Sequence, residues 1–320
     1  MPDERVPTEK DLVPPAEAPL VPPSPPAIEQ FAMAGEAAAG TITGIPGRTR
    51  VERIRTVVVY TLLFGIALVY FVPFLWTLST SLKTLPETAY FKLLPEHPTL
   101  DAYKDAFTTF DFSRYAANSA GLALTVAALN VFLCSLGGYA FARLKFPGRE
   151  VLFFVVLATL MVPDQLRLVP VYRIYSDHGL LDHYHGYVLI KLAAAAQLFL
   201  MRQYFLTIPK DLEEAAKLDG AGYFKTFWKV MLPLAGPAIA AVAILEFEGT
   251  WNDFFWPLVI FRSPSHYTLP VGIFSFVSEH RTLWPQLTAG SVIAIAPVAA
   301  IYIFFQRYFV AGVASAGVKG

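Results

Sequence analysis

The chain has 320 residues, of which 55% are hydrophobic, 14% are aromatic and 16% are charged, and its 25 basic side chains balance 25 acidic ones. Soluble domains are about 45–50% apolar and about 25% charged, so the composition excludes an ordinary soluble globular protein and indicates an integral membrane protein. The zero net charge gives no sign of a nucleic-acid partner. The single cysteine, Cys134, excludes a disulfide framework and a thiol metal site.

The first 50 residues differ from the rest of the chain. The stretch DLVPPAEAPLVPPSPPAIEQ is rich in Pro and Ala and has no periodic apolar face that a core could bury. Such a segment cannot offset the entropy lost on ordering, so we predict a disordered, partly polyproline II tail over residues 1–50. The tail carries early acidic residues and lacks the basic start and apolar run of a cleavable signal peptide.

Six stretches are apolar over the roughly 20 residues that a helix needs to cross a membrane. They cover residues 56–82, 116–142, 151–175, 184–205, 230–261 and 285–311. Pro163 and Pro170 interrupt the third stretch, and Lys191 lies within the fourth. We therefore predict an all-α, polytopic membrane protein with six transmembrane helices over residues 51–311.

Basic residues indicate how these helices are oriented. They precede the first stretch, fill the short loop after the second, crowd the segment between the fourth and the fifth, and follow the sixth. Because cytoplasmic loops of membrane proteins carry an excess of Lys and Arg, this pattern places both termini and a loop over residues 207–229 in the cytoplasm. The tail over residues 312–320, rich in small residues, is then cytoplasmic as well.

The segment EEAAKLDGAGYFKTFWKVMLPLAGPAI, from Glu213 to Ile239, is a polar helix-turn-helix attached to an apolar stretch. Pro209 suits the first turn of its first helix, and Gly220 suits the left-handed conformation that ends a helix. A second short helix is expected to bring Phe224, Phe227 and Trp228 to the membrane surface. The pattern is compatible with a docking element and also with an amphipathic loop that only anchors the bundle.

The residues of this segment resemble a known motif. Glu214-Ala215-Ala216, Asp219-Gly220-Ala221, Phe227-Trp228 and Leu232-Pro233 resemble the EAA motif of permease subunits in bacterial ABC importers. FVPFLWTLSTSLK (71–83), GGYAFARLKFPGRE (137–150), WNDFFWPLV (251–259) and FFQRYFVAGVASAGVKG (304–320) are similar to the carbohydrate-specific branch. More narrowly, residues 55–320 resemble the smaller, six-span permease of the maltose-importer type.

The resemblance implies a multi-pass permease subunit of an ATP-driven sugar importer in the bacterial cytoplasmic (inner) membrane. Its expected partners are a second permease subunit, an ATPase homodimer, an extracytoplasmic sugar-binding protein, the sugar and membrane lipid. The two permeases would form an alternating-access pathway. The chain has no G-x-x-x-x-G-K-[ST] phosphate loop, so we expect ATP and Mg²⁺ to bind the ATPase, and this chain to bind no cofactor and to be no enzyme.

In the family, the EAA motif is a coupling helix that sits in a groove of the ATPase, between transmembrane helices four and five. The resemblance implies that Glu214 pairs with a basic residue of the ATPase, that Ala215 and Ala216 permit close packing, and that Gly220 sets the turn. The ATPase-coupling residues implied in this way are Glu214, Ala215, Ala216, Asp219, Gly220, Ala221, Phe227, Leu232 and Pro233. The family also implies that the C-terminal tail reaches between the two ATPase subunits, and a frayed terminus is the alternative.

Ionisable groups inside a membrane are costly and therefore indicate function. In the fifth stretch, at about 100° per residue, Glu248 and Asn252 share one helical face, whereas Glu246 and Asp253 lie on a nearly opposite face. One face would line the sugar pathway and the other would hold neighbouring helices, and the sequence does not decide which. The alternative is that all of them only brace the bundle.

Two further residues complete the candidate pathway. Trp251, or one of the aromatic residues that follow it, is expected to stack on a sugar ring. Lys191 in the fourth stretch is expected to form an ion pair with Glu246 or Glu248.

Several polar residues lie outside both the EAA-like segment and the candidate pathway. Asp164 and Arg167, beside Pro163, predict a broken helix end that contacts a binding protein or merely caps itself. His183 and His185 have a spacing that occasionally binds metal, but without further ligands nearby we expect a loop or interface role and no metal site.

Two other functions have to be weighed. A self-sufficient secondary transporter usually carries internal inverted repeats, and the sequence has no convincing repeat. A membrane enzyme or scaffold is the second alternative, and the chain has no H-E-x-x-H or G-x-S-x-G motif to support it.

Overall fold

The computed structural model describes residues 50–317, apart from residue 91 and residues 278–281. The predicted disordered tail lies outside the described residues, except for Arg50, where the first helix begins. Contacts divide the chain into two units, Met1–Val69 and Tyr70–Gly320, and the packing described below is that of the second unit.

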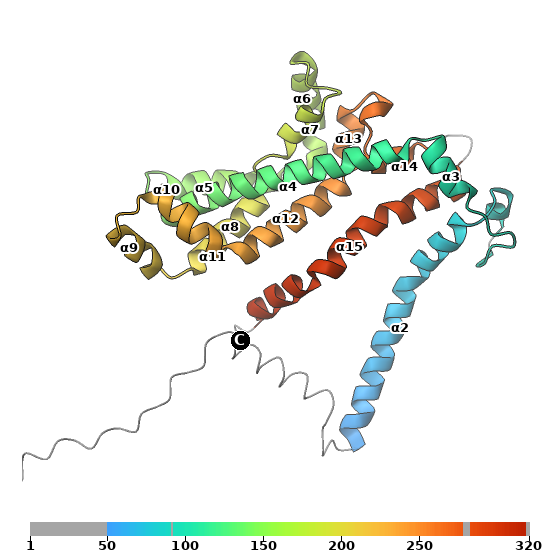
Figure 1. The fold of residues 1–320 in the computed structure, drawn as a ribbon, viewed down its shortest axis with the longest axis horizontal. Helices are drawn as coiled ribbons and strands as arrows, with labels where there is room; N and C mark the ends of the chain where they lie inside the picture. Colours follow the sequence, from blue (N-terminus) through green and yellow to red (C-terminus); the bar gives the residue numbers. More distant parts are fainter. Residues whose placement is uncertain (1–49, 91, 278–281, 318–320) are drawn as a thin grey trace, which may run out of the picture. The chain divides into compact units, whose positions relative to one another are not determined.

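Regular secondary structure in the described residues is helical throughout, which confirms the predicted all-α class (Figure 1). The first part of the chain forms α2 (Arg50–Ser81), η2 (Pro86–Ala89), α3 (Asp101–Thr108), α4 (Phe112–Arg143), α5 (Arg149–Ala158), η3 (Thr159–Met161), α6 (Asp164–Asp177), α7 (Tyr184–Lys191) and α8 (Ala195–Thr207). The second part forms α9 (Asp211–Leu218), α10 (Tyr223–Thr226), the π-helical η4 (Phe227–Met231), α11 (Leu232–Leu234), α12 (Gly236–Trp251), α13 (Phe255–Ile260), η5 (Pro264–His266), α14 (Leu269–Phe274) and α15 (Trp284–Gly317).

Length and composition support a membrane protein that crosses the bilayer several times. Within the described residues, α2 and α4 are long and apolar enough to span a membrane alone, and up to five spans result if each bent helix pair counts as one. Helix α15 has a shorter apolar part, Trp284–Ala300, and continues through Gly317 into the predicted C-terminal tail. Polytopic architecture is therefore supported, and the number of six crossings stays a prediction.

Helix α4 is the centre of the bundle, because α8 and α12 both pack along it (Figure 1). Small residues on α4 permit this packing, as expected for helices that associate in lipid. Gly138 brings α4 so close to α8 that an added Cβ atom would lie 2.7 Å from Cβ of Met201 and 2.9 Å from the backbone nitrogen of Arg202. The core at this crossing is closed by buried side chains that include Cys134, Met201 and Phe205.

Three of the six predicted spans are bent helix pairs. The third breaks at Pro163, where α5–η3 and α6 meet at 100°, as the sequence predicted, whereas Pro170 lies inside α6 and does not end it. The fourth bends by 47° between α7 and α8, where Ala193 takes a positive φ of 55°. This second break was not predicted, because neither Gly nor Pro marks it in the sequence.

The fifth predicted span, over residues 230–261, is wrong as a single helix. The helical run Tyr223–Leu234 meets α12 at an angle of 77°, and α12 itself ends at Trp251. Helix α13 follows as a separate element, with Phe254 as its N-cap residue. The residues between α12 and α13 therefore leave the helical face on which the sequence pattern placed them.

The close approach at Gly138 generates a test of the central packing. We expect Gly138→Ala to lower the thermal unfolding midpoint in detergent, because overpacking costs about 1–3 kcal/mol and the neighbouring α8 backbone cannot turn away. Gly121→Ala is the matched control on the same helix, since no heavy atom lies within 4 Å of a Cβ placed there. Equal midpoints for the two variants would contradict this packing.

Candidate functional site

The EAA-like segment forms a short helix with a well-defined end. Helix α9 begins at Asp211 with three acidic residues in its first turn, where the positive end of the helix dipole favours them. Pro209 precedes the N-cap residue Lys210, so its predicted place in the first turn is wrong. Gly220 has a φ of 76°, which confirms the predicted left-handed turn.

The turn after α9 is a Schellman motif. The backbone N–H of Ala221 donates to the carbonyl of Ala216 at 2.9 Å, and the N–H of Gly220 donates to the carbonyl of Lys217 at 3.0 Å. This pair of bonds requires a left-handed residue at the position of Gly220. The polypeptide thus turns sharply and continues at once into α10, η4 and α11, which form one helical run toward α12.

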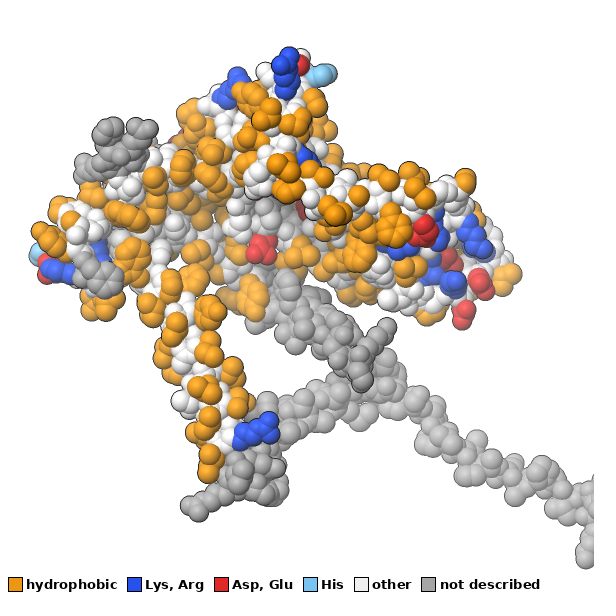
Figure 2. All heavy atoms as spheres, turned by 180° about the vertical axis from the view of Figure 1, so that it is seen from behind, with side chains coloured by type: hydrophobic (Ala, Val, Ile, Leu, Met, Phe, Trp, Pro, Cys, Tyr) orange, Lys and Arg blue, Asp and Glu red, His pale blue; other side chains and the backbone are white. Residues whose placement is uncertain are grey.

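Helix α9 presents a small-residue surface to the outside of the chain. Glu214, Ala215 and Asp219 are exposed, and Ala216 is half-buried. Sequence reasoning missed Leu218, which is 89% exposed at the end of the same helix. The available signal was a bulky apolar residue at the end of a short helix that carries several charged residues. Figure 2 shows charged side chains gathered mainly at the ends of the bundle, including the end with α9 and α10, and hydrophobic side chains over much of the rest.

The second half of the segment is more deeply embedded than the sequence suggested. Tyr223 and Phe224 are exposed, but Phe227 is only 2% exposed. Its ring lies 5.3 Å from the ring of Tyr139 on α4 and 5.4 Å from that of Trp228. The expectation that Phe227 faces the membrane surface is therefore wrong. The π-helical turn of η4 shifts the helical register, so residues 227 and 228 do not follow the spacing of an ordinary α-helix.

The remaining implied coupling residues lie where this helical run approaches α12. Leu232 is half-buried and packs against the core around α4 and α8, whereas Pro233 is exposed. Pro237 lies in the first turn of α12, where a missing N–H group leaves no bond unmade.

Three ionisable residues of the candidate pathway, Lys191, Glu246 and Asp253, lie in one cluster around the α7–α8 break. The ammonium of Lys191 lies 2.8 Å from Oδ2 of Asp253, and the hydroxyl of Tyr187 donates to the same oxygen at 2.9 Å. The expected pairing of Lys191 with Glu246 or Glu248 is wrong. Because α12 ends at Trp251, Asp253 leaves the helix and reaches α7 instead.

Asn130 on α4 connects this cluster to the helix break. Its amide nitrogen donates to the carbonyl of Lys191 at 2.8 Å and to Oε2 of Glu246 at 3.0 Å, and its amide oxygen accepts from the N–H of Ala194 at 3.1 Å. One side chain thereby satisfies backbone groups on both sides of the break and a carboxyl group of α12. Sequence reasoning missed Asn130, although a polar amide within an apolar stretch was a visible signal.

The other candidate pathway residues divide into buried and exposed sets. Trp251 is only 4% exposed, its indole N–H donates to the carbonyl of Ala294 on α15 at 3.1 Å, and its ring stacks on Phe247. The ring of Trp251 is therefore occupied by packing within this chain, and sugar stacking by Trp251 or by an aromatic residue after it stays a prediction. Glu248 and Asn252 are both exposed, which is consistent with the prediction that they share one face.

The loop that precedes α7 is clamped to the loop that follows α13. Asp182 (φ 60°) accepts hydrogen bonds from the N–H groups of Arg262 and Ser263 at 2.9 and 3.0 Å, and its carboxylate lies 3.0 Å from Nδ1 of His266. Burial acts to raise the pKa of Asp182, but the hydrogen bonds from Ser263, His266 and Arg262 outweigh it and hold that pKa well below its usual range. The clamp therefore stays charged at neutral pH.

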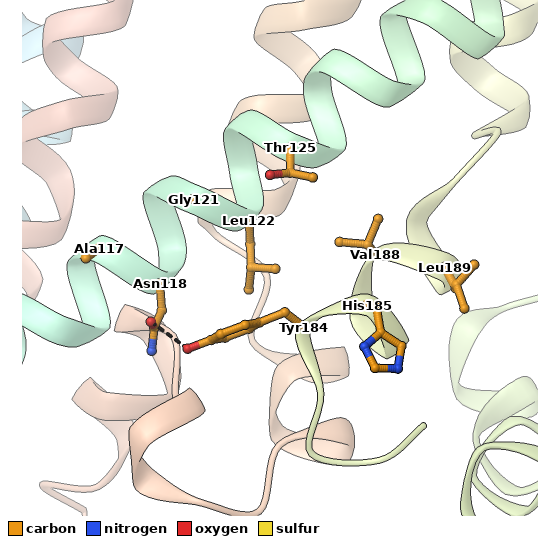
Figure 3. Close-up of a pocket in the computed structure, with 9 residues that line it drawn as sticks. All are labelled: Ala117, Asn118, Gly121, Leu122, Thr125, Tyr184, His185, Val188 and Leu189. Carbon is orange, nitrogen blue, oxygen red and sulfur yellow. Dashed lines mark hydrogen bonds between the residues drawn. The ribbon is translucent and has the colours of Figure 1, made fainter. Parts of the chain in front are cut away.

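A groove of about 510 Å³ lies between α4 and α7 (Figure 3). The hydroxyl of Tyr184 points toward Asn118 and donates to its amide oxygen at 2.8 Å, while Leu122 and Val188 supply apolar walls. His185 lines the same groove. Its ring lies 5.0 Å from that of His183, and no group of three or more candidate metal ligands occurs among the described residues.

Asp164 and Arg167 pair with each other at the start of α6. The N-cap residue of α6 is Pro163, and no side chain forms a capping hydrogen bond there, so neither of the two expectations for these residues is settled. A contact with a binding protein stays a prediction.

Comparisons with known proteins agree with this architecture. The profile of the family described as "Binding-protein-dependent transport system inner membrane component" matches residues 135–315. The arabinooligosaccharides transport system permease protein AraQ of Halalkalibacterium halodurans is 38% identical over 71% of this chain and 81% of its own length. The trehalose transport system permease protein SugB of Mycobacterium tuberculosis is 36% identical over 81% of this chain and 95% of its own length.

A solved structure extends the similarity to three dimensions. A chain in the crystal structure of a bacterial ABC transporter that imports the acidic polysaccharide alginate has a TM-score of 0.70 and 29% sequence identity, and the match covers 83% of this chain and 100% of that one. Sequence profile, relatives and fold agree, and this chain belongs to the family of binding-protein-dependent transport system inner membrane components.

Proposed function

We propose that this chain is one permease subunit of an ATP-driven sugar importer. It forms half of an alternating-access pathway together with a second permease subunit, and a separate ATPase homodimer supplies the work through α9. An extracytoplasmic binding protein delivers the sugar. The relatives named for arabinooligosaccharide and trehalose transport support a carbohydrate as the substrate.

The geometry of α9 is the observation that carries this proposal. The Schellman turn at Gly220 fixes the direction in which α9 leaves the chain, and the helical run Tyr223–Leu234 joins that turn to α12 without a flexible linker. Such an element can transmit a displacement, because hydrogen bonds and packing define each of its joints. An anchoring loop would not need this rigidity or the exposed small-residue surface around Ala215.

The charge pattern supports a cytoplasmic position for α9. Basic residues gather in the loop after α4 and between α8 and α12, and these two segments come together where Arg143 pairs with Glu213. From the positive-inside tendency we infer that both termini lie on the same side of the membrane as α9. This orientation brings the exposed carboxylate of Glu214 to a surface that a soluble ATPase can reach.

The polar residues on α12 and just after its end have different roles in the proposal. Glu246 and Asp253 are engaged by Asn130 and Lys191 and therefore hold α4, α7 and α12 together. Glu248 and Asn252 are exposed on the surface of this chain, so they are the pair that we assign to the sugar pathway. A carboxylate and an amide at these positions can accept and donate hydrogen bonds to sugar hydroxyls.

The turn at Gly220 provides a test of the coupling role. Proline cannot adopt a φ of 76°, and it lacks the N–H that bonds to Lys217. In vesicles that contain the complete importer, we expect Gly220→Pro to abolish most sugar uptake while ATP hydrolysis continues and the chain remains inserted.

Gly222→Ala is the matched control for this variant. Gly222 has an ordinary φ of −73°, and no heavy atom lies within 4 Å of a Cβ placed there, so normal uptake is expected. Normal uptake by the Gly220→Pro variant would show that the turn does not transmit the motion.

The ion pair between Lys191 and Asp253 is tested by a double-mutant cycle. Lys191→Met and Asp253→Asn are each expected to lower the thermal midpoint in detergent, since each leaves a charged group without its counter-ion in a largely buried site. The double variant should lose less than the sum of the two, with a coupling energy of about 0.5–3 kcal/mol. Strictly additive losses would contradict the pairing. Glu248→Gln, at an exposed position, should leave the midpoint unchanged.

A further inference from the structure

Arg143, the last residue of α4, reaches the buried side of α9. Its guanidinium Nε lies 3.1 Å from Oε1 of Glu213, and the side chains are only 4% and 9% exposed. Glu213 precedes the exposed Glu214 of the EAA-like motif but is itself buried within the chain. A charge pair this deeply buried is costly to desolvate, so its presence favours a specific geometric role over a gain in stability.

The same guanidinium also holds the end of α8. Its Nη2 atom donates to the carbonyl of Phe205 at 2.5 Å and to the carbonyl of Ile208. These carbonyls belong to the last turn of α8 and its C-cap, where a cation also complements the helix dipole. Only Pro209 and Lys210 separate this helix end from α9. One side chain therefore connects α4, α8 and α9.

The polar groups at this junction are not all satisfied. The N–H at Nε of Arg143 is not aligned with Glu213, so the contact is an ion pair without a hydrogen bond. The hydroxyls of Tyr139 and Thr226 are also buried without a hydrogen-bond partner among the described residues. Tyr139 lies one turn before Arg143, and Thr226 adjoins Phe227, on which the Tyr139 ring packs. Buried unpaired groups are unfavourable, so this junction is held at a cost in stability.

We infer that Arg143 is a positioning residue that passes the displacement of α9 directly to α4 and α8, through Glu213 and the carbonyls of α8. This inference rests on the proposed function and adds to it a second route of transmission, parallel to the covalent path through α10–α12. Since α8 and α12 both pack along α4, a displacement of the α4 end reaches the whole core. Glu213 and Arg143 then act as one unit.

The test uses the complete importer in lipid vesicles and measures ATP hydrolysed per sugar taken up. For Glu213→Gln and for Arg143→Gln, we expect the ATPase to remain bound and active while this ratio rises about tenfold, a typical size for a coupling between two sites. The double variant should be no worse than Arg143→Gln alone, because Glu213 acts only through Arg143. Asp211→Asn, an exposed acidic residue of the same helical turn, is the control and should keep the wild-type ratio.

A wild-type ratio in both single variants overturns the inference, and so does a double variant whose defect is the product of the single defects. A second measurement does not depend on these variants. Spin labels at Lys217→Cys on α9 and Lys145→Cys beyond α4 should keep one separation with and without a trapped ATP analogue, and buried Cys134 should stay unlabelled. A separation that changes with nucleotide overturns the rigid link.

The two levels of the proposal fail in different ways. If the wild-type importer takes up no sugar with ATP, the proposed function is wrong. If the wild-type importer takes up sugar normally and the Arg143 and Glu213 variants also keep the wild-type ratio of ATP to sugar, the proposed function stands. The second route of transmission is then ruled out.

Discussion

A polar helix has to be held rigidly against an apolar bundle, and the rest of this structure depends on that constraint. At the C-terminal end of α9, the left-handed turn at Gly220 holds the helix and leads into the helical run toward α12. In the first turn of α9, buried contacts between Glu213, Arg143 and the end of α8 hold the helix. With both sides fixed, α9 can present Glu214 and its small neighbours outward without flexing against the membrane helices.

The interior obeys a related rule, since backbone polar groups in hydrocarbon must find partners within the protein. The break between α7 and α8 exposes the carbonyl of Lys191 and the N–H of Ala194, and Asn130 satisfies both. The Lys191–Asp253 pair and the Asn130–Glu246 contact then tie α12 to the same point. The charged residues around the bend therefore hold these helices together. Glu248 and Asn252 are exposed, and they remain the pair that our proposal assigns to the transported solute.

Sequence alone predicts the features that depend on local conformation. The turn at Gly220 and the break at Pro163 follow from residue type, and both are present. It cannot predict features set by distant partners. The burial of Phe227 depends on a π-helical turn, the pairing of Asp253 depends on where α12 ends, and the role of Asn130 depends on a bend that no Gly or Pro marks. A periodic pattern assumes that a helix continues, and these residues lie where helices change.

The central claim is that the work for transport enters this chain from another protein through α9. The most direct measurement compares solute accumulation in vesicles that contain this chain alone with accumulation in vesicles that also contain the second permease and the ATPase. The account predicts accumulation only in the complete system, only with ATP, and only with the binding protein present. Accumulation by this chain alone, without ATP, would contradict it.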